Sequence, residues 1–132
     1  MPLISFENKV VLITGGGMGL GKAYCLGFGK AGAKVVCPDI NLRDAEETVS
    51  EVKAKGGEAM AMNVDVTQSD QVENMVREII ARFGRIDALV NNVGYIVRVN
   101  LLDWTGNVVD QTDSVIFGLF GAGWYGFTNV FE

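Results

Sequence analysis

Short apolar runs alternate with longer segments of helical periodicity along the first two thirds of the chain. The run Val10-Val11-Leu12-Ile13 is continuous and rich in β-branched residues, as expected for a strand that is covered on both faces. Three further runs have the same character. Together the four runs predict strands at 9–13, at 34–38 with Asp39 at its tip, at 58–64 and at 86–90.

The segments between these runs have apolar residues three and four positions apart, which predicts helices over 19–31, 42–55 and 69–83. Each segment is followed by a glycine, the residue favoured just beyond a helix C-terminus. The residues expected to face the core are Leu20, Ala23, Tyr24, Gly27, Phe28 and Ala31 in the first helix, Leu42, Ala45, Val49 and Val52 in the second, and Val72, Met75, Val76, Ile79 and Ile80 in the third.

The resulting order β-α-β-α-β-α-β predicts an α/β fold. Right-handed crossovers make the sheet parallel, with strand order 3-2-1-4 and helices on both faces. This is a Rossmann-like, doubly wound sheet that is truncated before the later strands. We expect residues 1–94 to form a dinucleotide-binding unit, with the ligand at the carboxyl ends of the strands, between the first and the fourth.

A glycine-rich turn, Thr14-Gly15-Gly16-Gly17-Met18-Gly19-Leu20-Gly21, joins the first strand to the first helix. Glycines there let the backbone come close to a pyrophosphate, and one of them lets helix and strand pack tightly. The unpaired N–H groups of the helix's first turn and the positive end of its dipole favour an anion. A glycine cluster alone would also suit a flexible loop, but its place between a strand and a helix favours a phosphate-binding turn.

Asp39 stands at the tip of the second strand. An acidic residue there is placed to accept hydrogen bonds from the ribose hydroxyls of an adenosine, and it would repel a ribose 2′-phosphate. Asp39 could also cap the next helix, which begins at Asp39 or Asn41, and the two roles are compatible. The nearby base, Arg43, is expected to face solvent. We therefore predict that the cofactor is NAD in preference to NADP.

Composition narrows the function classes. A net charge of −5, from 11 Lys+Arg and 16 Asp+Glu, gives no argument for binding nucleic acid or an anionic membrane. The chain has no histidine, so we expect neither a His-based triad nor a zinc site. Cys25 and Cys37 form no ligand pattern and are expected to be small buried hydrophobes. Without a signal-peptide core or a membrane-length apolar run, the sequence predicts a cytoplasmic protein.

Residues 7–94 resemble the N-terminal half of the short-chain dehydrogenase/reductase family. The turn at 14–21 matches the family's Thr-Gly-x-x-x-Gly-x-Gly, and Asn91-Asn92-Val93-Gly94 matches its Asn-Asn-Ala-Gly, with valine in place of alanine. Asp65-Val66 matches the acidic-apolar pair beside the adenine ring, and Asp39 matches the position that selects NAD. The resemblance implies hydride transfer between NAD(H) and an alcohol or carbonyl compound. The cofactor-binding residues that it implies are Thr14, Gly15, Gly17, Met18, Gly19, Leu20, Gly21, Asp39, Ile40, Asp65, Val66, Asn91, Asn92 and Gly94.

The family's catalytic residues are not found in this chain. The family uses a serine, and a tyrosine followed four residues later by a lysine, which lowers the pKa of the phenol so that it can exchange a proton near neutral pH. No lysine occurs after Lys55, and no catalytic residue is assigned. The residues four positions after the three tyrosines Tyr24, Tyr95 and Tyr125 are Phe28, Val99 and Asn129.

Residues 95–132 depart further from the family. The stretch 104–117 faintly resembles the family's fourth helix, but Thr112 stands where the family has an asparagine that helps to hold a proton-relay water. The apolar, glycine-rich run after it has neither strand nor helix periodicity. We expect this tail to pack on the same domain, over the open edge of the fourth strand, or to drive homo-oligomerisation.

Three functions stay open at this stage. One is an oxidoreductase of the family that turns over a small alcohol or carbonyl substrate only if a catalytic half is supplied. The second is a module that binds the dinucleotide without turnover. The third is a structural or interaction remnant of the family. Stoichiometric NAD binding without turnover would distinguish the second from the other two.

Overall fold

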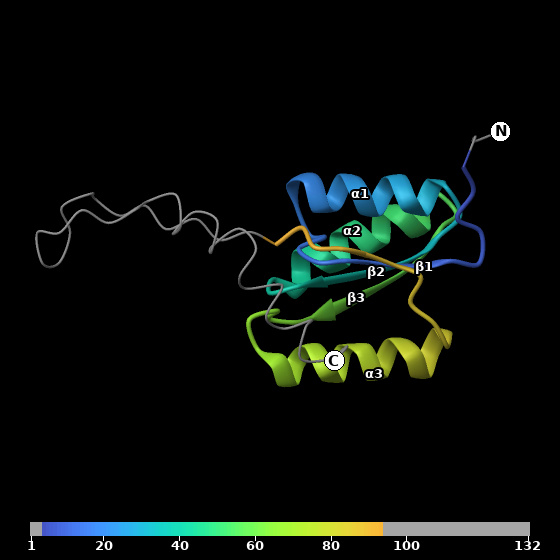
Figure 1. Ribbon diagram of the computed structural model, residues 1–132. Coiled ribbons are helices and arrows are strands. Elements are labelled where there is room, and N and C mark those ends of the chain that lie inside the picture. The colour runs from blue at the N-terminus through green and yellow to red at the C-terminus, as the bar shows by residue number, and fades with distance from the viewer. Residues whose placement is uncertain (1–3, 94–132) are drawn as a thin grey trace, which may run out of the picture.

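The computed structural model describes residues 4–93 of the 132-residue chain. Every predicted strand and helix is found in this range (Figure 1), although β4 begins at Ala88 and not at residue 86. The expectations for Gly94, for 104–117 and for the packing of the tail lie outside the described residues. The bounds are β1 Val10–Ile13, α1 Gly19–Lys30, β2 Lys34–Asp39, α2 Leu42–Ala54, β3 Glu58–Asn63, α3 Ser69–Phe83 and β4 Ala88–Val90.

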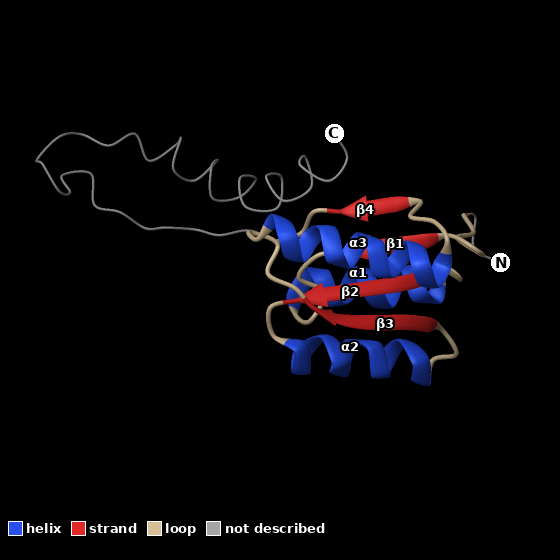
Figure 2. Ribbon diagram, turned by 90° about the horizontal axis from the view of Figure 1, so that it is seen from below, coloured by secondary structure: helices blue, strands red, loops and turns tan. Residues whose placement is uncertain are grey.

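The strands form one parallel sheet in the order β3-β2-β1-β4 (Figure 2), as predicted. β1 lies between β2 and β4, so that Val11 is opposite Val35 on one side and Ala88 on the other. α1 and α2 cover one face of the sheet, and α3 covers the other (Figure 1). Because all strands are parallel, the loops that follow them converge at one edge of the sheet.

Alternation along the strands divides the core into two layers, since successive side chains point to opposite faces. Val10 and Leu12 of β1 pack on the α3 side, and Val11 and Ile13 pack under α1 and α2. All four are at most 1% exposed. The other buried members of the α3 layer are Val36, Met62, Val64, Val66, Val72, Met75 and Ile79, and those of the opposite layer are Cys25, Ala33, Val35, Cys37, Ala45, Val49, Val52 and Ala59.

The predicted core face of α1 is wrong. Leu20 and Tyr24 are 67% and 40% exposed, and the residues buried in this helix are Gly21 and Cys25. The reason is steric, because a Cβ on Gly21 would lie only 2.1 Å from the carbonyl oxygen of Gly15. Small residues therefore face the sheet in the first turns of this helix, and Leu20 and Tyr24 point outward. Of the other predicted positions, Ala23 and Gly27 are exposed, whereas Phe28 and Ala31 are partly buried.

The apolar stripes predicted for α2 and α3 face the core, except at one edge of each. Leu42 and Ile80 are 38% and 45% exposed, whereas Ala45, Val49 and Val52 of α2 and Val72, Met75 and Ile79 of α3 are buried. Asn41, and not Asp39, is the N-cap of α2, since its side-chain oxygen accepts a hydrogen bond from the Asp44 N–H. Asp39 is thus not the N-cap, although its carboxylate accepts a hydrogen bond from the Asn41 N–H at 2.9 Å.

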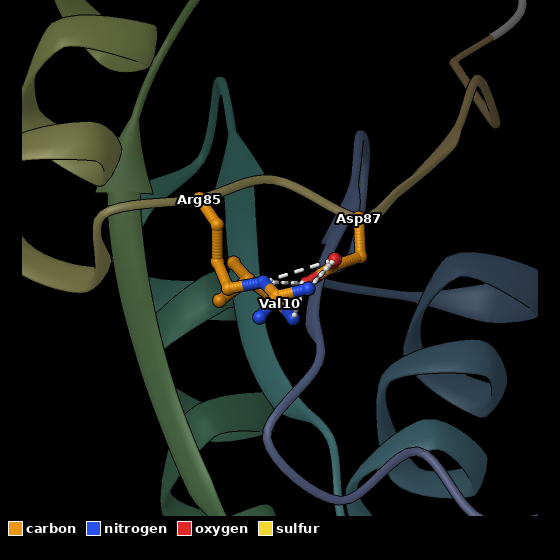
Figure 3. Close-up of polar contacts among 3 residues, drawn as sticks. All are labelled: Val10, Arg85 and Asp87. Carbon is orange, nitrogen blue, oxygen red and sulfur yellow. Dashed lines mark hydrogen bonds and ion pairs between the residues drawn. The ribbon is translucent and has the colours of Figure 1, made fainter.

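Asp87 ties the loop before β4 to the start of β1 (Figure 3). Its Oδ2 accepts a hydrogen bond from the Val10 N–H at 2.8 Å and another from Arg85 Nε at 2.8 Å. The Arg85 guanidinium is the main cause that lowers the pKa of Asp87 below its ordinary value of 3.8, and the Val10 N–H adds to the effect. This contact fixes the register between β1 and β4 at the end of the sheet away from the glycine turn.

Candidate functional site

Thr14 holds together the two loops that leave β1 and β4. Its side chain is completely buried. The Oγ1 atom accepts hydrogen bonds from the N–H groups of Asn92 at 3.1 Å and Val93 at 3.3 Å, and it donates one to the carbonyl of Val90 at 3.4 Å. A single hydroxyl thus uses its donor and both of its acceptor positions inside the protein. In the structure Thr14 therefore acts as a clamp between the glycine turn and the loop after β4.

Gly15 is held on three sides. Its N–H donates to the carbonyl of Pro38 at 2.9 Å, and its own carbonyl accepts a hydrogen bond from Asn92 Nδ2 at 3.3 Å. The Cα of Gly21 approaches the same carbonyl so closely that no side chain fits there. The glycines at 15 and 21 thus allow β1, β2, α1 and the loop after β4 to meet at one point, as the motif predicts.

The N-terminus of α1 is open to an anion. Its N-cap, Met18, makes no side-chain capping bond, and the first intrahelical bond runs from the Lys22 N–H to the Met18 carbonyl at 3.2 Å. The N–H groups of the three residues between them therefore precede the helical ladder. The first turns of α2 and α3 carry the carboxylates of Asp44 and Asp70, whereas that of α1 carries none. The first turn of α1 itself thus supplies no counter-charge to the positive end of the helix dipole.

Gly19 adds room at this point. It has a φ of +56°, and a Cβ placed on it would have no heavy atom within 4 Å. The backbone turns here in the left-handed region that glycine adopts most easily. Met18 and Leu20 on either side are 69% and 67% exposed. The start of α1 is therefore a bare stretch of backbone that an outside group can approach closely.

The Asp39 carboxylate faces the glycine turn. Its Oδ2 accepts a hydrogen bond from the Gly17 N–H at 2.9 Å, and its Oδ1 accepts one from the Asn41 N–H at 2.9 Å. Each carboxylate oxygen has two lone pairs, so each can accept a further hydrogen bond from outside. Asp39 is only partly buried, which leaves these positions reachable. Arg43 points to solvent as predicted, with a side chain that is 86% exposed.

Asp65 and its neighbours form a second group at the same edge of the sheet. Asp65 Oδ1 accepts hydrogen bonds from the N–H of Thr67 at 2.9 Å and from its hydroxyl at 2.7 Å, and these bonds lower the pKa of Asp65. The Asp65 N–H donates to Gln71 Oε1 at 2.8 Å. Val66 is buried in the α3 layer, whereas Ile40 is 72% exposed beside Asp39. Asp65 therefore serves as a turn residue in the structure, and the side chain of Val66 belongs to the core.

The asparagines after β4 differ in their surroundings. Asn91 is exposed, and Asn92 is partly buried against Gly15. A Cβ on Gly15 would lie 3.0 Å from Val93 Cγ2, so Val93 packs directly on the turn. Within residues 4–93 there is no cluster of three or more potential metal ligands. In the same range no helix is long and apolar enough to cross a bilayer.

Sequence reasoning missed the support beneath Gly17. Thr48 of α2 is completely buried, and its hydroxyl donates to the Gly17 carbonyl at 3.4 Å. A Cβ on Gly17 would lie 2.7 Å from both Asp39 Oδ2 and Asp44 Cβ, so this glycine is wedged against the start of α2. The one signal in the sequence was Thr48 itself, a polar residue on the apolar side of a predicted helix. Its partner lies 31 residues away in the chain, which the helical pattern cannot indicate.

Comparison with known proteins identifies the family. The family model described as short chain dehydrogenase matches residues 9–121. A short chain dehydrogenase/reductase from Colletotrichum higginsianum is 41% identical over 110 residues, which cover 83% of this chain and 40% of that relative. The solved structure of a short chain dehydrogenase/reductase from Burkholderia phymatum in complex with NAD has a TM-score of 0.80 at 28% identity. This match covers 98% of this chain and 44% of that one.

A third relative is the 3-ketoacyl-(acyl-carrier-protein) reductase from Brucella melitensis, whose solved structure is complexed with NADH. It has a TM-score of 0.75 at 33% identity, and the match covers 95% of this chain and 49% of the relative. The chain therefore spans less than half the length of each of these three proteins. The family model covers most of the chain, and the fold with its glycine turn agrees with it. The chain belongs to the short chain dehydrogenase family.

Proposed function

We propose that this chain binds NAD(H) at the carboxyl edge of the sheet as the cofactor-binding half of an oxidoreductase. The observation that carries the proposal is the uncapped N-terminus of α1, which has no carboxylate in its first turn and directly follows the clamped glycine turn. Two relatives of known structure were solved with NAD or NADH. An acid-free helix N-terminus behind a glycine turn provides N–H donors for a pyrophosphate.

The remaining contacts follow from the order of the strand ends. Asp39 would accept hydrogen bonds from the adenosine ribose through its free lone pairs, and the exposed side chain of Ile40 would cover one face of the adenine. Asp65 and the backbone of Val66 would line the adenine edge. The residues after β4, namely Asn91 and Asn92, would lie toward the nicotinamide half. A bound nicotinamide supplies the hydride that is exchanged with an alcohol or a carbonyl compound.

Asp39 favours NAD over NADP for an electrostatic reason. A ribose 2′-phosphate would be placed against a carboxylate whose two oxygens already accept N–H donors from Gly17 and Asn41. Arg43, the base nearest in sequence, is exposed, and its Nε lies 3.7 Å from Glu47 Oε1. Like charges about 4 Å apart repel by roughly 1–4 kcal/mol, depending on the local dielectric.

A second candidate function is binding without turnover. It is favoured by the 132-residue sequence, in which none of the three tyrosines is followed four residues later by a lysine. A tyrosine with an ordinary pKa near 10 is a poor proton donor or acceptor at neutral pH. With the chain alone, NADH absorbance in the presence of simple aldehydes and ketones should therefore stay constant, and steady NADH oxidation would rule this candidate out.

The binding site itself is tested at Gly19, where the structure has room for a side chain. Asp and Asn are the non-glycine residues that best tolerate a left-handed backbone, so both variants should fold. Gly19→Asp places a negative charge against the pyrophosphate, and Gly19→Asn is its uncharged control of the same size. Calorimetric titration with NADH should show at least about tenfold weaker binding for Gly19→Asp than for Gly19→Asn. Equal NADH affinities of the two variants would show that the pyrophosphate does not bind at Gly19.

A further inference from the structure

Two cysteine thiols lie side by side beneath the glycine turn. A Cβ placed on Gly16 would be 2.5 Å from Cys37 Sγ and 2.8 Å from Cys25 Sγ. The two sulfurs therefore occupy the space that a side chain at position 16 would fill. One comes from β2 and the other from α1, and both residues are completely buried. Neither cysteine is among the residues that match the family's motifs.

The thiols interact with each other in the free, reduced state. A hydrogen bond with the Cys25 thiol, followed by burial, raises the pKa of the Cys37 thiol well above its ordinary value. The Cys37 thiol is thus uncharged at neutral pH, and a thiol in this state reacts slowly. Reaction with an oxidant then requires the turn above them to open, as loops at ligand sites do most readily.

The Cys37 backbone is directly connected to the groups that shape the turn. The next residue, Pro38, accepts the Gly15 N–H, and the residue after it, Asp39, accepts the Gly17 N–H. Gly16 lies between these two hydrogen bonds and rests on the sulfurs. A change in the distance between the two sulfurs would therefore alter the part of the turn that precedes the N-terminus of α1.

We propose that Cys25 and Cys37 are a disulfide-forming site, and that closing this disulfide weakens dinucleotide binding. The two thiols together lose two electrons and two protons. Hydrogen peroxide takes them up: one thiol attacks the peroxide, which becomes a sulfenic acid on that sulfur and one water. The other thiol then attacks the sulfenic sulfur, and its hydroxyl leaves as the second water. The new bond is about 2.0 Å long, shorter than any contact between two thiols, so β2 and α1 are drawn together under Gly16.

The first experiment tests the covalent step alone. The full 132-residue chain is treated with hydrogen peroxide, and trypsin then releases Cys25 and Cys37 in separate peptides, 23–30 and 35–43. We expect one linked peptide pair about two mass units lighter than the sum of its parts, formed in monomeric protein and reversed by dithiothreitol. Failure to form this pair, or formation of disulfides only between chains, would overturn the proposal.

The second experiment measures the consequence, which rests on the proposed function. NADH affinity should fall about tenfold or more in the oxidised chain and recover on reduction. Cys25→Ser and Cys25→Ala cannot form the bond, so NADH binding by whichever variant folds, as judged by circular dichroism, should be insensitive to peroxide. Unchanged affinity in disulfide-linked protein would overturn the proposal. If the reduced chain binds no NADH, the proposed function fails, while the mass measurement still decides whether the disulfide forms.

Discussion

Replacing Gly21 by alanine should destabilise the protein, whereas the same replacement at Gly27 should not. Both glycines lie in α1, but a Cβ at Gly21 would be 2.1 Å from the Gly15 carbonyl oxygen and 2.6 Å from Asn92 Nδ2. A Cβ at Gly27 would have no heavy atom within 4 Å. The pair thus separates the helix propensity of alanine, which is common to both variants, from the steric conflict, which only one of them has.

The magnitude follows from these distances. The nearest atom to the new Cβ at position 21 is a backbone oxygen only 2.1 Å away, which cannot rotate away, so the turn or the helix has to shift. Overpacking of this kind costs typically about 1–3 kcal/mol. At Gly27 alanine should gain up to about 1 kcal/mol from its better helix propensity. Because the propensity gain is common to both variants, we expect them to differ by the steric cost alone, roughly 1–3 kcal/mol in the free energy of unfolding.

Urea unfolding followed by circular dichroism measures this difference, with the wild-type chain beside both variants. The Gly21→Ala midpoint should fall below that of the wild type, and the Gly27→Ala midpoint should equal or exceed it. If Gly21→Ala proves as stable as Gly27→Ala, α1 does not lie against the glycine turn as the structure has it. The steric account of the buried face of α1 would then be wrong as well.

Two further predictions concern the supports of the sheet edge. Thr14→Val removes the hydroxyl that accepts the N–H groups of Asn92 and Val93, so it should lower the free energy of unfolding by about 1–3 kcal/mol, and an unchanged urea midpoint would contradict the clamp. Arg85 lowers the pKa of Asp87 in the folded protein below its value in the unfolded chain. The ionised Asp87 therefore contributes fully to the free energy of unfolding at pH values above the unfolded-state pKa, and this contribution is lost as the pH falls through the lower folded-state pKa. The free energy of unfolding should therefore decrease as the pH is lowered below about 4, and it should decrease less steeply in Asp87→Asn. Identical dependence on pH in the two proteins would refute this role of Asp87.

The sheet could be predicted from the sequence because its signals are local. Each strand is a short apolar run, and the run at Val10–Ile13 is buried throughout. Right-handed crossovers between strands that alternate with helices give a parallel sheet, and the glycine turn after the first strand favours the order 3-2-1-4. The glycine turn and Asp39 could be located for a similar reason, since the motif depends on spacing within one βαβ unit.

The orientation of α1 could not be predicted in the same way. A periodicity argument gives weight to large apolar side chains, and it therefore selected the face of Leu20 and Tyr24. The packing is decided instead by how closely the helix approaches the turn, which only the three-dimensional distance between Gly21 and Gly15 shows. In this helix the small residues form the contact.

Several details of the site depend on partners that are distant in sequence. The hydroxyl of Thr14 clamps a loop 78 residues away, and the Asp39 carboxylate binds the Gly17 N–H across the turn. By contrast, Asp65 accepts a hydrogen bond from the N–H of Thr67, only two residues later, and a local sequence pattern could suggest such a turn. Nothing in the sequence pattern indicated that both cysteines would lie under Gly16.

The most direct test of the account is a calorimetric titration of the 132-residue chain with NADH and then with NADPH. We expect saturable binding of one NADH per chain and an affinity for NADPH that is at least about tenfold weaker, because Asp39 repels the 2′-phosphate. In Asp39→Ala, NADH should bind more weakly and the gap between the two cofactors should narrow. A folded chain that binds neither dinucleotide, or that binds both equally well, would contradict the central claim.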